Sequence, residues 1–191
     1  MKQIIRFPGF YTIGLIVFVF ITTLALVGSF NLAINYTNTE SFCISCHEMK
    51  ANSFEEYKDT VHASNRSGVK ASCPDCHVPR EFFPKIYAKI MAVKDVYHHL
   101  MGTIDSKEKF EEAKLEMAQT VWQKMKQSDS RECRVCHAIS AMDFDEQKGR
   151  AKRKHQKIEE KGKTCIDCHK GVAHELPDDY DQDTPDQTDL G

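Results

Sequence analysis

Four copies of the pattern C-x-x-C-H use all eight cysteines of this 191-residue chain. The cysteines are Cys43, Cys46, Cys73, Cys76, Cys133, Cys136, Cys165 and Cys168, and the histidines that follow each pair are His47, His77, His137 and His169. This pattern is typical of c-type haem attachment, in which two thiols bind the macrocycle and the adjacent imidazole reaches the iron. Zinc ribbons and disulfides also use paired cysteines, but neither needs a histidine after every pair. The motifs predict four covalently bound c-type haems and electron transfer.

A second axial ligand for each iron must come from side chains outside the motifs. The histidines available are His62, His98, His99, His155 and His174. Met49 lies two residues after His47 and is either a thioether ligand, which would raise the reduction potential, or part of the packing. His174 follows His169 so closely, by ~17 Å of extended chain, that we expect it to serve a neighbouring haem.

The stretch of residues 10–27 is almost wholly apolar. Its length fits a transmembrane helix, which needs about 20 residues, and exceeds the ~7–15 residues of the apolar core of a cleaved signal peptide. Lys2 and Arg6 precede it and predict a cytoplasmic N-terminus by the positive-inside rule, in a bacterial inner membrane. The expected divisions are a cytoplasmic end at 1–9, a single-pass signal anchor at 10–34, a periplasmic tetrahaem domain at 35–176 and an acidic, disordered tail at 177–191.

The motifs form two pairs, and each pair contains an internal histidine, His62 or His155. This repetition predicts a compact, mainly α-helical domain built as two two-haem units, with little or no strand. The interval between the pairs has apolar residues at three- and four-residue steps after Pro84, which predicts a helix that ends at Gly102. A second helix is expected from near Asp105, with a capping box.

The part of the chain after the anchor has few large apolar residues. We therefore expect the macrocycles to form much of the core, and the apoprotein not to fold. The net charge of -2 argues against a nucleic-acid-binding protein. The basic segment 148–163 is either a solvated helix face or a docking surface for an acidic redox partner.

Several segments, in order, resemble the NapC/NirT family of membrane-anchored tetrahaem cytochromes. They are FCISCHEM, NRSGVKASCPDCHVP, MAQTVWQKMK, ECRVCH and TCIDCHKGVAHELP, within about residues 36–177. The resemblance implies a quinol dehydrogenase that takes electrons from menaquinol or ubiquinol and passes them to a periplasmic reductase, foremost nitrate reductase. It also implies haem-iron ligands at His62, His155 and His174 and a quinol site beside the first haem, formed by Met49, Lys89 and Asp95. The sequence is compatible with a homo-oligomer as well as with a monomer.

The quinol assignment makes chemical sense of two of these residues. Asp95 could accept a proton from the quinol, and Lys89 could donate a hydrogen bond to a quinone oxygen. An ordinary exposed pair on an amphipathic helix is the alternative. Arg80 departs from the family, many members of which have histidine there, and a protonated guanidinium cannot ligate iron. The sixth ligand of one haem, expected to be the first, is therefore open.

Two other functions fit parts of the sequence. One is the quinol-oxidising small subunit of a multihaem nitrite reductase complex, which Met49 and Arg80 favour, whereas residues 65–79 and 164–177 favour the donor to nitrate reductase. The other is a terminal reductase that acts on its own open haem. The absence of a C-x-x-C-K variant disfavours it, as does the expected place of any open haem, against the membrane where quinol is the obvious substrate.

Overall fold

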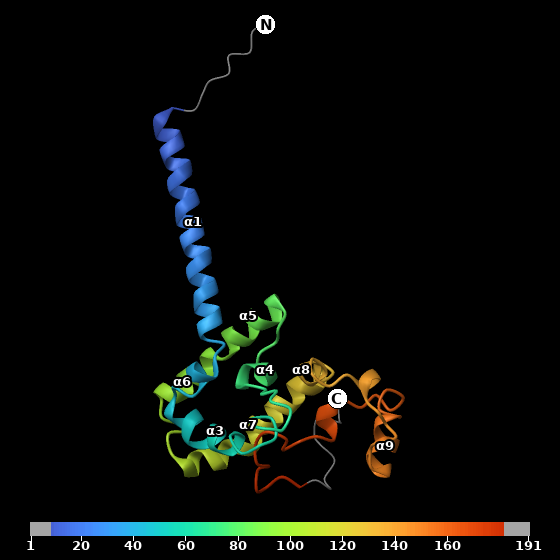
Figure 1. The fold of residues 1–191 in the computed structure, drawn as a ribbon. Helices are drawn as coiled ribbons and strands as arrows, with labels where there is room; N and C mark the ends of the chain where they lie inside the picture. The colour runs from blue at the N-terminus through green and yellow to red at the C-terminus, as the bar shows by residue number, and fades with distance from the viewer. Residues whose placement is uncertain (1–8, 182–191) are drawn as a thin grey trace.

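The computed structural model describes residues 9–181 as helices joined by turns and bends (Figure 1). The predicted cytoplasmic end lies outside these residues except for Gly9, and so do residues 182–191 of the acidic tail. Between residues 9 and 181 there is no strand, and one long apolar helix stands at the N-terminal end. The prediction of a mainly helical fold with a single long N-terminal apolar helix is confirmed.

The helices alternate between a few long elements and many single turns. They are α1 (Phe10–Tyr36), α2 (Glu40–Cys43), the π-helical η1 (Met49–Ser53), α3 (Phe54–Tyr57), α4 (Cys73–His77), α5 (Phe82–Met91), α6 (Val93–Leu100), α7 (Lys107–Gln127), α8 (Arg131–Arg134), the 3-10 turn η2 (Ile139–Ala141), α9 (Gly149–His155) and the 3-10 turn η3 (Cys165–Asp167).

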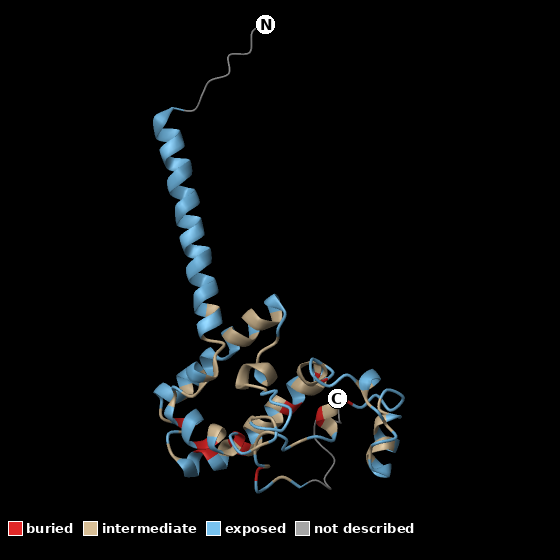
Figure 2. Ribbon diagram, in the orientation of Figure 1, coloured by how far each residue is buried: buried red, intermediate tan, exposed pale blue. Residues whose placement is uncertain are grey.

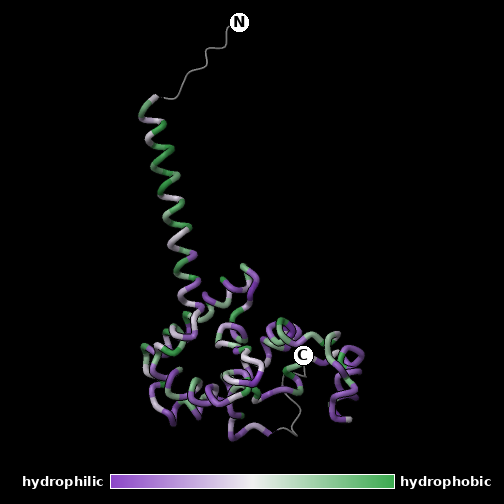
Figure 3. Tube along the Cα trace, in the orientation of Figure 1, coloured by the Kyte–Doolittle hydropathy of each residue, from purple (hydrophilic) through white to green (hydrophobic). Residues whose placement is uncertain are grey.

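Helix α1 extends away from the other helices and has no buried residue (Figure 1). Its 27 residues correspond to about 40 Å, against about 30 Å for the hydrocarbon core of a bilayer. Within residues 9–181 it is the one helix long and apolar enough to cross a membrane. Its exposed residues are mostly apolar, and the trace of α1 is largely green in the hydropathy colouring of Figure 3, which suits a lipid environment.

The single helix predicted after Pro84 is two helices in the structure, α5 and α6. Helix α5 already begins at Phe82, because proline is tolerated in a first turn. The carbonyl oxygen of Ala92 accepts from both Asp95 N and Val96 N, at 3.1 and 3.3 Å, so the chain tightens there without leaving the helical region. Gly102 follows α6 with a φ of 63°, the left-handed conformation of a helix stop.

Helix α7 begins one residue later than the predicted cap at Asp105. The hydroxyl of Ser106 accepts from the backbone N–H of Lys109 at 3.3 Å and caps the helix. Near the other end of α7, the ring of Trp122 lies 4.9 Å from that of Tyr180. Tyr180 belongs to the predicted acidic tail, so the first part of that tail packs against the domain.

The domain buries few apolar side chains. Among residues 9–181 they are Tyr57, Phe110, Trp122 and Ile166, and Figure 2 shows how sparse the buried positions are. Ser130 is completely buried, and its hydroxyl oxygen accepts from Ile166 N at 3.1 Å, which ties the start of α8 to η3. So small a core supports the prediction that macrocycles form much of the interior.

Candidate haem sites

Each C-x-x-C-H motif starts on a short helix, and at the second and fourth motifs side-chain hydrogen bonds fix the first turn. In the second motif, Asp75 Oδ2 accepts from both the backbone N–H and the hydroxyl of Ser72, at 2.9 and 2.6 Å. In the fourth, Asp167 Oδ2 accepts from Thr164 N at 2.7 Å and from its hydroxyl at 3.0 Å. These are capping boxes, which sequence reasoning missed although the S/T-x-x-D spacing signals them. They fix the backbone on which the cysteines stand.

The four motifs follow one another in space in the order of the sequence. Helix α2 packs against α4, and α4 packs against α8. A hydrogen bond between the thiols of Cys43 and Cys73 lowers the pKa of Cys43 to about 7 and raises that of Cys73. Burial, with the nearby Cys165 and Cys76 thiols, raises the pKa of Cys133 to about 11. No disulfide joins any of these eight cysteines, all of which lie within residues 9–181. The motifs therefore form one row.

Three motif histidines each lie beside a histidine from outside the motifs. The ring centroids are 6.3 Å apart for His62 and His137, 6.2 Å for His77 and His174, and 6.0 Å for His155 and His169. Two imidazoles that bind one metal through nitrogen, at about 2.0–2.1 Å each, have ring centroids about 6 Å apart. No three His, Cys, Asp or Glu side chains within residues 9–181 converge as a zinc site requires. The residues fit three haem irons, each between two imidazoles.

These pairs connect the two halves of the sequence. His62, from the first half, lies beside the third motif, and His174, from the second half, lies beside the second motif. Only His155 lies beside a motif of its own half, the fourth. His174 thus lies beside His77 and not beside His169, which is only five residues away in the sequence. This agrees with the expectation that so short a connection makes His174 serve a neighbouring haem. The fold is compatible with two two-haem units, but the units would exchange ligands.

The outer nitrogens of two of these histidines are held by hydrogen bonds. His62 Nδ1 donates to the Val172 carbonyl oxygen at 3.3 Å, and His155 Nδ1 donates to Gln147 Oε1 at 2.7 Å. In a neutral imidazole with Nδ1 protonated, Nε2 keeps its lone pair for a metal. Such hydrogen bonds also orient the ring of a metal ligand.

His174 is positioned by a buried ion pair. Its Nδ1 lies 3.8 Å from Glu56 Oε2, which also accepts from the backbone N–H of Glu175 at 3.1 Å. The other oxygen of Glu56 accepts from Lys114 Nζ at 2.7 Å, and both charged side chains are largely buried. Lys114 on α7 therefore fixes the Glu56 carboxylate, and this carboxylate in turn fixes the backbone next to His174.

The surroundings keep several of these imidazoles neutral. Desolvation by the protein atoms around His77, with the neighbouring His174 imidazole as the next cause, lowers the pKa of His77 to about 4, although its side chain keeps an exposed part. Desolvation is also the largest cause of the lowered pKa values of His169, likewise partly exposed, and of the half-buried His174. Neutral imidazole is the form that binds metal, so these environments suit haem ligands.

The first motif differs from the other three. Among residues 9–181, His47 is the one motif histidine without another histidine ring at such a distance. Met49 lies in η1 and is 42% exposed. The residue between them, Glu48, is buried and accepts from His99 Nδ1 at 2.9 Å. The sequence left His99 among the possible second ligands without assigning it to a haem, and the structure places it next to the first motif, where the sixth ligand stays open.

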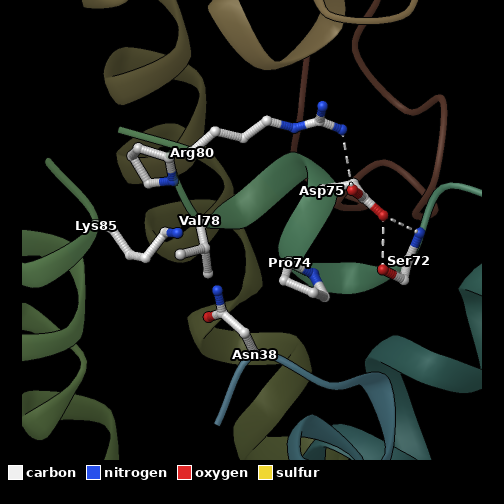
Figure 4. Close-up of a pocket in the computed structure, with 8 residues that line it drawn as sticks. Asn38, Ser72, Pro74, Asp75, Val78, Arg80 and Lys85 are labelled. Carbon is white, nitrogen blue, oxygen red and sulfur yellow. Dashed lines mark hydrogen bonds and ion pairs between the residues drawn. The ribbon is translucent and has the colours of Figure 1, made fainter. Parts of the chain in front are cut away.

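Arg80, the departure from the family pattern, lines a cavity behind the second motif. Its guanidinium reaches Asp75 Oδ1 at 3.4 Å (Figure 4). The cavity, of about 180 Å³, is lined mostly by polar residues, namely Asn38, Ser72, Pro74, Asp75, Val78, Pro79, Arg80 and Lys85. Pockets for apolar ligands are lined mainly by apolar side chains, and this one contains neither Lys89 nor Asp95. It is therefore not the predicted quinol site.

Of the predicted quinol-site residues Met49, Lys89 and Asp95, Lys89 is the one with a hydrogen bond to the end of the anchor. Its Nζ donates to the Thr37 carbonyl oxygen, just after α1, at 2.6 Å. Burial lowers the pKa of Lys89, and Cys43 of the first motif is near enough to oppose this shift. Asp95 is exposed on α6, one turn before His99. The structure thus brings Lys89 to the membrane end of the first motif and places Asp95 on the helix that contacts Glu48.

A row of haem-attachment motifs, held by a domain with little apolar core of its own and joined to a membrane-length helix, defines the class of protein. It is a membrane-anchored multihaem cytochrome c that transfers electrons. Residues 8–179 match the model of the NapC/NirT cytochrome c family, N-terminal region. The chain belongs to this family, and the resemblance noted in the sequence is confirmed.

Relatives match over most of their length. The chain is 48% identical over 173 residues to the denitrification system component NirT of Stutzerimonas stutzeri, which covers 91% of this chain and 86% of NirT. It is 48% identical over 174 residues to the cytochrome c-type protein NapC of Escherichia coli K12, and the match covers 91% of this chain and 87% of that protein. A tetraheme cytochrome-c type protein of Allochromatium vinosum is 51% identical over 162 residues, 85% of this chain and 88% of that protein. No solved structure matches the chain.

Proposed function

We propose that this protein is a quinol dehydrogenase that oxidises membrane quinol and donates the electrons to a periplasmic reductase, with nitrate reductase as the partner. The observation that carries the proposal is the contact of Lys89 with the end of α1, beside Cys43 of the first motif. It puts a hydrogen-bond donor where a lipid-soluble substrate would meet the first haem. Residues 65–79 and 164–177, which resemble nitrate reductase donors of the family, support the choice of partner.

The orientation belongs to the same proposal. Lys2 and Arg6 before α1 favour a cytoplasmic N-terminus, which puts the haem domain in the periplasm of a bacterium with an inner membrane. Attachment of c-type haem takes place in that compartment in bacteria. A periplasmic domain is also the one that a periplasmic reductase can reach.

The residues that would hold the haems follow from the motifs and from the three histidine pairs. Each pair of motif cysteines would form the thioether bonds, and His47, His77, His137 and His169 would be the proximal ligands. His174, His62 and His155 would be the distal ligands at the second, third and fourth motifs. When bound, the haems supply reversible one-electron transfer.

The oxidation of a quinol to a quinone releases two electrons and two protons. Lys89 uses one of its three N–H donors on the Thr37 carbonyl oxygen, which leaves two for a quinone oxygen. Asp95 can take a proton as a carboxylate, and its exposure lets that proton pass on to water. The pair therefore provides binding and proton removal at one end of the row of motifs.

Asp95→Asn is expected to slow quinol-driven haem reduction by on the order of 10²-fold, the usual effect of losing an acid–base group, and Lys89→Gln is expected to slow it through the loss of the charged donor to the quinone oxygen. The measurement is stopped-flow absorbance of the full-length protein in detergent or nanodiscs. Lys94→Gln is the matched control, because it makes the same change as Lys89→Gln at a position on α6, the helix of Asp95. All variants should keep four haems per chain. Wild-type rates in both test variants would remove these residues from the mechanism.

A further inference from the structure

Outside the anchor, large exposed apolar side chains concentrate on α5 and α6. On α5 they include Phe83, 82% exposed, with Tyr87 and Ile90. On α6 they include Leu100, 77% exposed, with Val93 and Tyr97. Soluble domains rarely leave contiguous apolar surface of this kind uncovered. In Figure 2 α6 is mostly blue and α5 is part blue and part tan, and both have green stretches in Figure 3; their exposed apolar side chains therefore need a partner.

The position of α5 relative to the anchor identifies the partner. The rings of Phe30 and Phe82 lie 6.5 Å apart, and Figure 1 shows α5 beside the C-terminal end of α1. A helix that enters the hydrocarbon at Phe10 leaves it about 20 residues later, near Phe30. The start of α5 is thus at the level where the hydrocarbon ends.

The apolar side of α6 points away from the first motif. His99 contacts the buried Glu48, and Asp95, four residues earlier, shares its side of the helix. At about 100° per residue, the stripe of Val93, Tyr97 and Leu100 is centred roughly 150° round from that side. The residues around His47 therefore do not cover this stripe.

The apolar side of α5 likewise points away from the anchor. Phe82 and Lys89 face α1 through the Phe30 ring and the Thr37 carbonyl oxygen. The exposed residues Phe83, Tyr87 and Ile90 are centred roughly 120° round the helix from them, at about 100° per residue. Neither α1 nor the first motif can bury this face.

We infer that α5 and α6 lie in the outer headgroup region of the bilayer, with their apolar faces at the boundary of the acyl chains. The alternation of these faces with Lys85 on α5 and Lys94 on α6 is the pattern of an interfacial amphipathic helix, whose basic side chains reach lipid phosphates. This second membrane contact lays the haem domain against the bilayer. The inference that α5 and α6 contact the bilayer depends on the membrane anchor and not on quinol being the substrate.

Photo-crosslinking of the full-length holoprotein in phosphatidylcholine–phosphatidylglycerol nanodiscs tests the inference. The photoreactive residue p-benzoylphenylalanine replaces Phe83 or Tyr97, both exposed aromatic positions, so that the haem domain stays intact. Leu24 within α1 is the positive control. Val61, next to His62, is the matched control outside α5 and α6, because its exposed fraction of 69% lies between those of Tyr97, 58%, and Phe83, 82%.

Lipid adducts, measured by mass spectrometry of the digested protein, should form at positions 83 and 97 at least tenfold above position 61 and near the level of position 24. Adduct yields at both positions no higher than at 61 would overturn the inference. Crosslinks between two copies of the chain in place of lipid adducts would also overturn it, because a second copy would then cover the face. Quinol oxidation by the same samples is a separate readout.

Discussion

Replacing His62 with alanine is expected to turn one haem of the four, the one attached at the third motif, from low spin to high spin. The imidazole of His62 lies 6.3 Å from that of His137, centroid to centroid, and no other histidine ring shares that contact within residues 9–181. His62 would be the distal ligand of that haem, so its loss would leave the iron one ligand short. Electron paramagnetic resonance of the oxidised full-length protein should show a new high-spin signal and one low-spin haem fewer.

The His62→Met variant sharpens this test, because a thioether keeps six ligands on the iron. It should stay low spin and raise the reduction potential of the same haem by on the order of 0.1 V, within the ~0.8 V over which axial ligands set haem potentials. His98→Ala is the control, since His98 Nδ1 contacts the Thr103 hydroxyl at the end of α6 and no motif histidine. Four unchanged low-spin haems in the His62→Ala protein would refute the pairing.

Replacement of all eight cysteines by alanine is expected to unfold the domain after α1. Four buried apolar side chains, worth about 1.5–3 kcal/mol each, cannot offset the ordering of more than a hundred residues. Circular dichroism in detergent should therefore lose most of the helical signal, except for that of the 27 residues of α1.

A variant that lacks only Cys165 and Cys168 is the control for this experiment. It should lose one haem and the local structure of η3 while most of the helical signal remains, because the other motifs do not depend on that turn alone. A native-like helical spectrum of the cysteine-free protein would contradict the account and would mean that the polypeptide folds without its cofactors.

The parts of this site that the sequence predicts are those with a local cause. The size of the macrocycle fixes the spacing within each C-x-x-C-H motif, and the bilayer fixes the length of an apolar run. The stop at Gly102 is equally local, because glycine accepts a φ of 63° without strain. The tightened turn at Ala92 was not predicted, since neither glycine nor proline marks it.

The pairing of histidines has no local cause and could not be predicted. His62 and His137 are 75 positions apart, and only the packing of α4 against α8 brings the second and third motifs together. The contact between His99 and Glu48 is of the same kind, across 51 positions. Arg80 could be identified as a departure, but its ion pair with Asp75 required the fold.

The structure also makes the four motifs unequal. The first alone lacks a paired histidine within the described residues, and it is the one beside Lys89 and the end of α1. The fourth lies next to His155 at the end of the basic helix α9. Electron entry at the first motif and exit toward the fourth follow from this order as part of the proposed function.

The central claim is that electrons pass from membrane quinol through this protein to a periplasmic reductase. The most direct measurement is a quinol titration of the purified full-length protein in nanodiscs, followed by addition of periplasmic nitrate reductase with nitrate. The account predicts that quinol reduces the haems and that the reductase, with nitrate, reoxidises them. Haems that stay oxidised with excess menaquinol and with excess ubiquinol would contradict it.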